Sequence, residues 1–319
     1  MYCSLRTDFP WLRVDYLCEL FGYSTQAYYQ SLNRKHLSSV QEDMVLETVK
    51  EIRAMMPRIG VRKLQYMLAK NYGLEIGRDR LFDILRMAGM LAKPRRNRTR
   101  TTFSKHHFHI YPNAIIDVVP SRPNEIWVSD ITYILMGDKF YYLYLITDAY
   151  SKKIVGWKLS DTLFTINAVE ALKMAIRQCD STRGLIHHSD RGTQYCASKY
   201  IALLKKHGIM PSMTENGDPR QNAIAERVNG ILKKEFIELA DLTEDNAEAK
   251  LKNIINIYNS KRPHLSLGYF TPEEAHHMNG EQIRLWKPYY YKSNDMSQKN
   301  DTFADANNRD DDHLDRSPP

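Results

Sequence analysis

The sequence is short of cysteine and has no apolar stretch long enough to cross a membrane. Its four cysteines, Cys3, Cys18, Cys179 and Cys196, are scattered and form no CxxC pair. This spacing excludes a disulfide framework and a zinc ribbon, so we expect reduced, partly buried thiols. No apolar run approaches the roughly 18–20 residues of a membrane span, and the first residues lack the layout of a signal peptide. We therefore expect a cytoplasmic protein without a membrane partner.

Motifs of several common enzymes are also absent. No GxxxxGK[ST] occurs, so the sequence does not predict ATP binding. No GxSxG occurs either, which argues against a serine nucleophile of the hydrolase type. His106, His107 and His109 lie close together, but no cysteine or second histidine pair is spaced to complete a zinc site. The chemistry must therefore come from other side chains.

Charge is distributed unevenly along the chain. The net charge is +7, but residues 295–319 carry seven Asp against three Lys or Arg, which leaves +11 on residues 1–294. A strongly basic folded part favours a polyanionic partner. Residues 291–319 are acidic and poor in apolar side chains, so we predict a disordered tail there.

Three acids stand in contexts that indicate a shared site. Asp130 lies inside WVSDITYI, an apolar run typical of a strand, and Asp190 closes the short apolar run LIHHS before a glycine turn. Glu226, with 35 residues between it and Asp190, lies in a helical pattern, and it points roughly 200° away from Ile224 on the apolar stripe. We expect the two aspartates side by side at the strand ends, with Glu226 facing them from outside the core.

Carboxylates that a fold brings together repel one another unless a cation neutralises them. Hard oxygen ligands without Cys or His suit Mg²⁺ or Mn²⁺. Two such ions can clamp the attacking and leaving oxygens of a displacement at phosphorus, so we predict two ions and phosphodiester chemistry. Taken singly, each acid is more often an ordinary solvated or capping carboxylate.

Five blocks carry a family resemblance, in this order: SDITYI, YLYLITDAYSKKIVGW, HHSDRGTQY, SMTENGDPRQNAIAERVNGILKKE and YNSKRPHLSLGYFTPEEA. Over about residues 41–275 the chain resembles the integrase-core transposases of bacterial insertion sequences, and most nearly the OrfB proteins of the insertion-sequence-three class. The resemblance implies a ribonuclease H-like core related to retroviral integrase. It also implies that Asp130, Asp190 and Glu226 form the metal-binding, catalytic DDE triad. The chain departs from the usual pattern at Ser129 and Gln221, neither of which belongs to the triad.

The same resemblance implies partners and a location. It implies double-stranded DNA as substrate, both as element ends and as target, and a homo-oligomer assembled on that DNA. A protein from a first reading frame is a further partner that the family implies. A nucleoid-associated place in a bacterial cytoplasm follows from these expectations.

The N-terminal part is predicted to be helical. Residues 14–34 indicate two short helices around Gly22, with Ser24 or Thr25 as cap, and we treat residues 1–40 as a helical hairpin that either reads DNA or only packs. Residues 41–95 predict three helices of a helix-turn-helix-like, DNA-binding region. Arg78 and Arg80 lie in the first turn of the third helix, where they contact DNA or form a solvated basic face.

A basic linker joins this region to the core. We place it at residues 96–114, within a stretch from Lys93 that holds six Lys or Arg. Its lack of apolar period indicates no packed element, and we expect Arg95, Arg96 and Arg98 to contact DNA phosphates.

The catalytic core is predicted at residues 115–290. Strand-like runs at 126–135, 140–148 and 153–159 form an antiparallel meander, followed by alternating helices and strands at 165–178, 185–189, 198–207, 209–213 and 221–239. This order predicts an α/β fold with a mixed five-stranded sheet and flanking helices. A further helix at 243–258 is predicted to open with Thr243 as cap, and Thr271-Pro272 predicts another helix start.

The predicted helix 221–239 carries a polar stripe beside Glu226. Seven residues at 100° each bring Lys233 back to the face of Glu226, and Asn222 and Asn229 lie near the same line. This stripe is either a solvated surface or a DNA contact in which Lys233 holds a phosphate, as the resemblance implies. We therefore include Lys233 and Asn222 among the expected DNA contacts.

These observations predict a transposase that binds the ends of a mobile element and cleaves and joins DNA with metal ions. One rival is a ribonuclease H-fold nuclease that cleaves without joining. The other is a non-catalytic DNA-binding protein derived from a transposase. The intact set of three repelling acids argues against the second rival, because a chain without catalysis has no physical need for it.

Overall fold

The computed structural model describes residues 11, 13–92, 108–116, 118–215 and 219–280. The predicted tail at 291–319 and most of the predicted basic linker lie outside these residues. The statements below concern the described residues alone.

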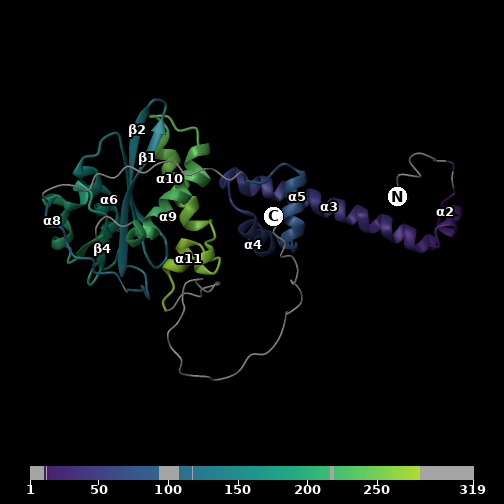
Figure 1. Ribbon diagram of the computed structural model, residues 1–319, viewed down its shortest axis with the longest axis horizontal. Helices are drawn as coiled ribbons and strands as arrows, with labels where there is room; N and C mark the ends of the chain where they lie inside the picture. Colours follow the sequence, from purple (N-terminus) through teal and green to yellow (C-terminus); the bar gives the residue numbers. More distant parts are fainter. Residues whose placement is uncertain (1–10, 12, 93–107, 117, 216–218, 281–319) are drawn as a thin grey trace, which may run out of the picture. The chain divides into compact units, whose positions relative to one another are not determined.

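A five-stranded mixed sheet forms the centre of the core (Figure 1). Its order is β3-β2-β1-β4-β5, with β1–β2 and β2–β3 antiparallel and β1–β4 and β4–β5 parallel. The bounds are β1 Ile126–Met136, β2 Lys139–Asp148, β3 Ile154–Ser160, β4 Ile186–Ser189 and β5 Met210–Met213. The predicted meander, parallel portion and strand count are therefore confirmed.

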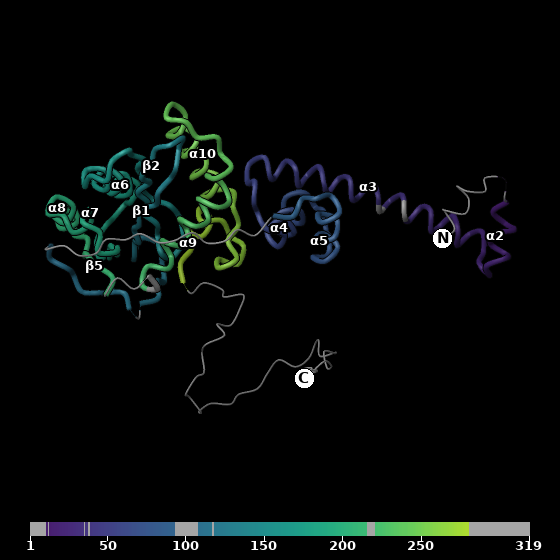
Figure 2. Tube along the Cα trace, turned by 45° about the horizontal axis from the view of Figure 1, so that its top comes forward, coloured from purple at the N-terminus to yellow at the C-terminus, as the bar shows by residue number. Residues whose placement is uncertain are grey.

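Helices cover both faces of the sheet, as Figure 2 also shows. On one face α6 (Thr165–Arg177) and α8 (Ser198–Lys206) pack with Trp127 and Tyr144. On the other face α9 (Ala223–Ile231) and α10 (Ala247–Ser260) pack with Leu143 and Leu145. The alternation of side chains along β1 and β2 supplies both apolar faces, which is the expected consequence of a sheet buried on two sides.

One glycine fixes how closely a helix approaches the sheet. A Cβ at Gly156 in β3 would lie 2.3 Å from the carbonyl oxygen of Ala171 in α6 and 2.9 Å from the Cβ of Ala175. Only a residue without a side chain allows this approach. The glycine in IVGW therefore sets the packing of α6 against the sheet.

The N-terminal helices are α2 (Val14–Leu20), α3 (Thr25–Met55), α4 (Val61–Tyr72) and α5 (Arg78–Met87). Ser24 caps α3, since its hydroxyl accepts from the amide of Ala27 at 3.1 Å. The expected break between residues 34 and 41 is wrong, because α3 is continuous through it. No Gly or Pro occurs in this helix, so the chain has no residue that would end it there.

These helices share an apolar core with the sheet. Ile52, Leu64 and Leu81 belong to the same buried cluster as Leu143 and Phe236. The guanidinium of Arg58 donates to the carboxylate of Glu238 at 2.9 Å, and Tyr66 stacks on Tyr269 with centroids 4.7 Å apart. The helical region is therefore packed on the core through burial as well as through charge.

The segment after β5 differs from the predicted single helix 221–239. It begins as the 3-10 turn η1 (Pro219–Asn222) and α9, widens into the π-helix η2 (Leu232–Phe236), and ends as the 3-10 turn η3 (Ile237–Leu239). A π-helix has one more residue in each hydrogen-bonded turn than an α-helix, and the helical periodicity of the sequence does not reveal this extra residue.

Predictions for the last two helices had mixed outcomes. The predicted cap Thr243 is wrong, because α10 begins at Ala247 with Asn246 before it. The start at Thr271 is confirmed, since Thr271 and Glu274 form a capping box for α11 (Pro272–His276). The short helix α7 (Thr193–Cys196) and the 3-10 turn η4 (Leu265–Leu267) were not predicted.

Candidate active site

The strand register places two of the three acids side by side. Ser129 of β1 pairs with Ser189 of β4 in the parallel ladder, and Asp130 and Asp190 are the next residues on each chain. Beyond this pair β4 ends while β1 continues to Met136, so no strand among the described residues pairs with the β4 side of β1 from Asp130 onward. The two carboxylates therefore stand where the sheet edge opens.

Backbone geometry holds Asp190 in place. The amide of Gly192 donates to its Oδ1 at 2.9 Å, and a Cβ on Gly192 would lie 3.0 Å from the same oxygen. Arg191 turns away and donates to the carbonyl of Thr214 at 2.7 Å. The glycine after the second aspartate thus permits a tight turn that presents the carboxylate.

Helix α9 brings the third acid. Val228 and Ile231 are buried against the sheet, while Glu226 is exposed on the opposite side, as its helical position predicts. Asn229, which is 6% exposed, donates from Nδ2 to Oδ2 of Asp130 at 2.7 Å. One face of α9 therefore anchors the helix, and its polar positions reach the strand acids.

The acids act on one another electrostatically. The pKa of Asp130 is raised to about 7, mainly because its half-buried carboxyl group is desolvated and because Asp190 and Glu226 add negative charge. The hydrogen bond from Asn229 opposes this rise. Repulsion of this kind is relieved by a proton or by a divalent cation.

The donor set fits a hard cation. Three carboxylates within electrostatic reach of one another, without cysteine, are the ligands that Mg²⁺ and Mn²⁺ prefer. Among the described residues, however, no three His, Cys, Asp or Glu side chains already converge as a closed metal cluster. The three acids are neighbours, but their side chains do not form a closed set of metal ligands.

The two histidines before Asp190 support β4 from inside. The Nε2 of His187 lies 2.7 Å from the Ser129 hydroxyl and 2.9 Å from the Tyr200 hydroxyl, and His188 Nδ1 lies 2.9 Å from the Ser212 hydroxyl. Burial lowers the pKa of His187 to about 3 and that of His188 to about 4. Both are therefore neutral and structural at physiological pH.

Lys233 lies in the π-helix and reaches β1. Its Nζ donates to the carbonyl oxygen of Tyr133 at 2.7 Å, and burial lowers the pKa of its ammonium. The predicted face shared with Glu226 assumed a regular α-helix through residue 233, and that assumption is wrong. Lys233 still lies near the acids because Tyr133 follows Asp130 by three residues.

The other predicted DNA contacts have different surroundings. Arg78 pairs with Asp79 at 2.8 Å, and Arg80 pairs with Glu42. Asn222 is 4% exposed and donates to the carbonyl of Ser129 at 2.9 Å, so it joins η1 to β1 instead of facing outward. The predicted linker arginines, Arg95, Arg96 and Arg98, lie outside the described residues.

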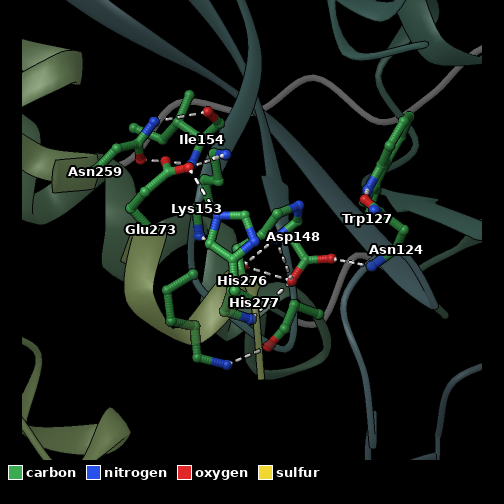
Figure 3. Close-up of polar contacts among 12 residues, drawn as sticks. Asn124, Trp127, Asp148, Lys153, Ile154, Asn259, Glu273, His276 and His277 are labelled. Atoms are coloured by element: carbon green, nitrogen blue, oxygen red, sulfur yellow. Dashed lines mark hydrogen bonds and ion pairs between the residues drawn. The ribbon is translucent and has the colours of Figure 1, made fainter. Parts of the chain in front are cut away.

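A second polar cluster lies at the end of β2 (Figure 3). Asp148, which is fully buried, accepts from the Asn124 amide, the Ser151 amide and the Ser151 hydroxyl, each at 2.7 Å. The Ser151 hydroxyl also lies 2.9 Å from Nδ1 of His276 in α11. Because its single proton goes to Asp148, the hydroxyl accepts from His276, and it is 0% exposed. It is therefore no nucleophile, and the cluster fastens α11 to the β2–β3 turn.

Within the described residues, no helix combines the length and the apolar content needed to cross a membrane.

Known proteins match this chain along most of its length. The integrase core domain family matches residues 120–219 and 207–272. The insertion element IS600 uncharacterized 31 kDa protein of Shigella sonnei is 33% identical and covers 82% of this chain and 99% of its own. The transposase for insertion sequence element IS904 of Lactococcus lactis is 30% identical over 77% of this chain and 98% of its own. Transposase InsF for insertion sequence IS3A of Escherichia coli is 32% identical over 61% and 69%.

Among solved structures, the HTLV-2 integrase catalytic core domain in complex with magnesium aligns with 21% identity and a TM-score of 0.40, over 49% of this chain and 98% of that one. The sequence relatives and the family matches establish the relationship. The chain belongs to the integrase-core transposases of the insertion-sequence-three class, with the ribonuclease H-like core that was predicted.

Proposed function

We propose that this chain binds the ends of its mobile element and catalyses metal-dependent cleavage and joining of DNA strands, with Asp130, Asp190 and Glu226 as the metal ligands. The observation that carries the proposal is the ladder register Ser129–Ser189, which places Asp130 beside Asp190 under the polar side of α9. The raised pKa of Asp130 supports it, because a carboxyl group that burial and two neighbouring acids hold near pKa 7 is stabilised in its charged form by a cation.

Each side chain then has a defined task. Asp130, Asp190 and Glu226 would together hold the metal ions, with Asp130 as the central acid. Asn229 orients Asp130 through its 2.7 Å hydrogen bond, and the Gly192 amide orients Asp190. Bound Mg²⁺ or Mn²⁺ would neutralise the scissile phosphate and lower the pKa of the attacking water or 3′-hydroxyl.

DNA is held by cations around this centre. Lys233 is one of them, since it bonds to the strand that carries Asp130. Arg78, Arg80 and the linker arginines Arg95, Arg96 and Arg98 would contact phosphates further away, where each neutralised phosphate makes binding more sensitive to salt. We leave Asn222 out of this surface because it is buried. A homo-oligomer on DNA and a first-reading-frame partner remain part of the proposal.

The test is incubation of the purified chain with labelled element-end DNA and Mg²⁺ or Mn²⁺. Cleaved ends and strand-transfer products are expected, and both should disappear in Asp130→Asn. Cleavage without any joined product would favour the nuclease alternative. A separate readout is thermal unfolding, in which Mn²⁺ should raise Tm of the parent chain and not that of Asp130→Asn. An equal rise in both would remove Asp130 from the ligand set.

A further inference from the structure

The hairpin of β1 and β2 carries an exposed apolar surface on the α6 side of the sheet, three to five residues beyond Asp130 along β1. Tyr133 is 37% exposed, Leu135 59% and Phe140, which faces them from β2, 53%. In the ladder Tyr133 pairs with Tyr142 and Leu135 with Phe140, so these side chains form one patch on the hairpin. Burying aromatic rings stabilises a folded protein, so rings that stay exposed near a charged site need a physical explanation.

The rings are fixed but not covered. Tyr133 meets Tyr142 with centroids 5.1 Å apart at 77° and Phe140 with centroids 6.4 Å apart at 81°. Neither neighbour within the described residues lies parallel to the Tyr133 ring. By contrast, Tyr66 and Tyr269 are stacked at 13°. Tyr133 is therefore held at a set angle without a stacked ring on its faces.

Its place relative to the acids is equally defined. Tyr133 follows Asp130 by three residues, or ~10 Å of strand, so its side chain points to the α6 side of the sheet whereas that of Asp130 points to the α9 side. Burial raises the pKa of the Tyr133 phenol, and the charges of Asp190 and Asp130 add to the rise. The Lys233 ammonium bonds to the Tyr133 carbonyl at 2.7 Å. Asp130 and the Tyr133 ring thus lie on the two sides of the open edge of β1, and Lys233 reaches that edge at the Tyr133 carbonyl. The separation along the strand is on the scale of two or three nucleotide steps of roughly 3.4 Å.

We propose that Tyr133 is a stacking platform for an unpaired DNA base close to the cleaved phosphodiester, with Lys233 holding the adjoining phosphate. This inference rests on the proposed function, because it places the DNA strand at the three acids. An unpaired base would supply a flat apolar surface parallel to the Tyr133 ring, which neither neighbouring ring supplies. A phosphate would supply a negative charge for the Lys233 ammonium, whose present hydrogen bond is to a neutral carbonyl. Stacking of this kind tolerates any base, since every base has a π-face.

The experiment uses the full-length chain and a forked DNA duplex of arbitrary sequence, with 2-aminopurine in the unpaired 3′ arm and Ca²⁺ in place of Mg²⁺. The parent chain and Tyr133→Phe should quench the fluorescence, because both present a ring. Tyr133→Ala and Tyr133→Leu should not quench it, and both should bind the fork about 5- to 150-fold more weakly. Affinity for the fully paired duplex should stay within about twofold.

Tyr72→Ala serves as the control, since Tyr72 is a similarly exposed tyrosine (41%) on α4. The Leu variant keeps the apolar bulk, so unfolding of the Ala variant alone leaves the test decisive. Equal fork affinity and quenching in Tyr133→Leu and the parent chain would overturn the proposal. So would a change of oligomeric mass in Tyr133→Leu without loss of fork affinity, because the patch would then be a protein contact. If the parent chain quenches yet cleaves no element end, the proposed function fails while the stacking platform stands.

Discussion

Two aspartates of the same sheet have opposite surroundings. Asp148 at the end of β2 is fully buried, and three donors at 2.7 Å satisfy its carboxylate. Asp130 on β1 is half-buried, has one side-chain donor in Asn229, and lies beside two further acids. A satisfied carboxylate stabilises a fold, whereas a group of repelling ones costs stability and so indicates a site kept for chemistry.

The cations around these aspartates differ in the same way. Near Asp148, Lys153 pairs with Glu273 at 2.9 Å. Near Asp130, Lys233 bonds to a neutral carbonyl, and its acidic neighbour Glu238 pairs with Arg58 at 2.9 Å. The first cluster has its charges matched within the chain. In the second, the Lys233 ammonium bonds to a neutral oxygen, and this is the cation at which the proposed function expects a DNA phosphate.

The largest expected effect is on catalysis. Asp130→Asn, Asp190→Asn and Glu226→Gln should each lower DNA cleavage by several orders of magnitude while DNA affinity changes little, because each removes a proposed metal ligand at constant side-chain volume. Two measurements test this: cleavage of labelled element-end DNA, and a titration that gives the DNA affinity of each variant. Substantial cleavage by any one variant would exclude that residue from the ligands.

The second prediction compares Asp148 and Asp130 by how their substitution changes the free energy of unfolding at pH 8. Asp148→Asn should destabilise the fold by roughly 2–4 kcal/mol, because buried donors lose their charged acceptor. Asp130→Asn should instead stabilise the metal-free chain by roughly 1–3 kcal/mol, discounted for the partial exposure of the carboxyl.

The sign for Asp130 follows from its raised pKa. Its protonated form is favoured in the fold, so that contribution is present below the unfolded pKa near 3.8 and is lost as pH rises through about 7. Asparagine does not titrate, so the Asp130→Asn variant does not lose stability in this way as the pH rises. Urea unfolding of both variants without metal measures the two changes, and changes of the same sign would end the distinction between the clusters.

Much of this arrangement could be predicted from the sequence, and the failures have local causes. Strand bounds were right to within one residue because apolar runs and turn residues mark them, and Glu226 was placed outside the core by its helical phase. Asp148 and Asp190 each close an apolar run, in LITD and IHHSD, so sequence context alone does not separate a structural aspartate from a candidate ligand. The donors that distinguish them, Asn124 and Ser151 for one and Gly192 for the other, depend on turn geometry.

The helix after Glu226 shows a different limit. Its apolar pattern through Val228, Leu232 and Phe236 suits an α-helix as well as a π turn, because both keep these side chains on the core side. The prediction for Lys233 therefore placed it near the acids, as observed, but assumed the wrong helical geometry. The role of Asn229 as donor to Asp130 was visible only as a position on a polar stripe.

The third prediction concerns the histidines behind Asp190. With pKa values lowered to about 3 and 4, His187 and His188 stay neutral in the fold while the unfolded chain binds protons below about pH 6.5. Stability should therefore be full above pH 6.5 and fall, by up to about 1.4 kcal/mol per pH unit for each histidine, until those values are reached. Urea unfolding of the parent chain and His188→Gln measures the slope, with the exposed His36→Gln as control. An unchanged slope in His188→Gln would show that this histidine is not the source.

The smallest expected effect separates two adjacent lysines. Lys233→Ala should weaken binding of element-end DNA by about 3- to 10-fold and lower the salt slope by about 0.9, because one phosphate contact is lost. Lys234→Ala should change affinity by less than about twofold, since Lys234 is exposed one position further round the π turn. Fluorescence anisotropy across a salt series measures both.

Lys233 is informative because its present bond is to a neutral oxygen. If the ammonium served only to fasten η2 to β1, Lys233→Ala would lower Tm and leave the salt slope unchanged. If it holds a phosphate, the slope falls and the loss of affinity shrinks as salt rises. Equal small effects of the two lysine variants on affinity and slope would show that charge at the Asp130 cluster is no more available to DNA than the matched charge at Asp148.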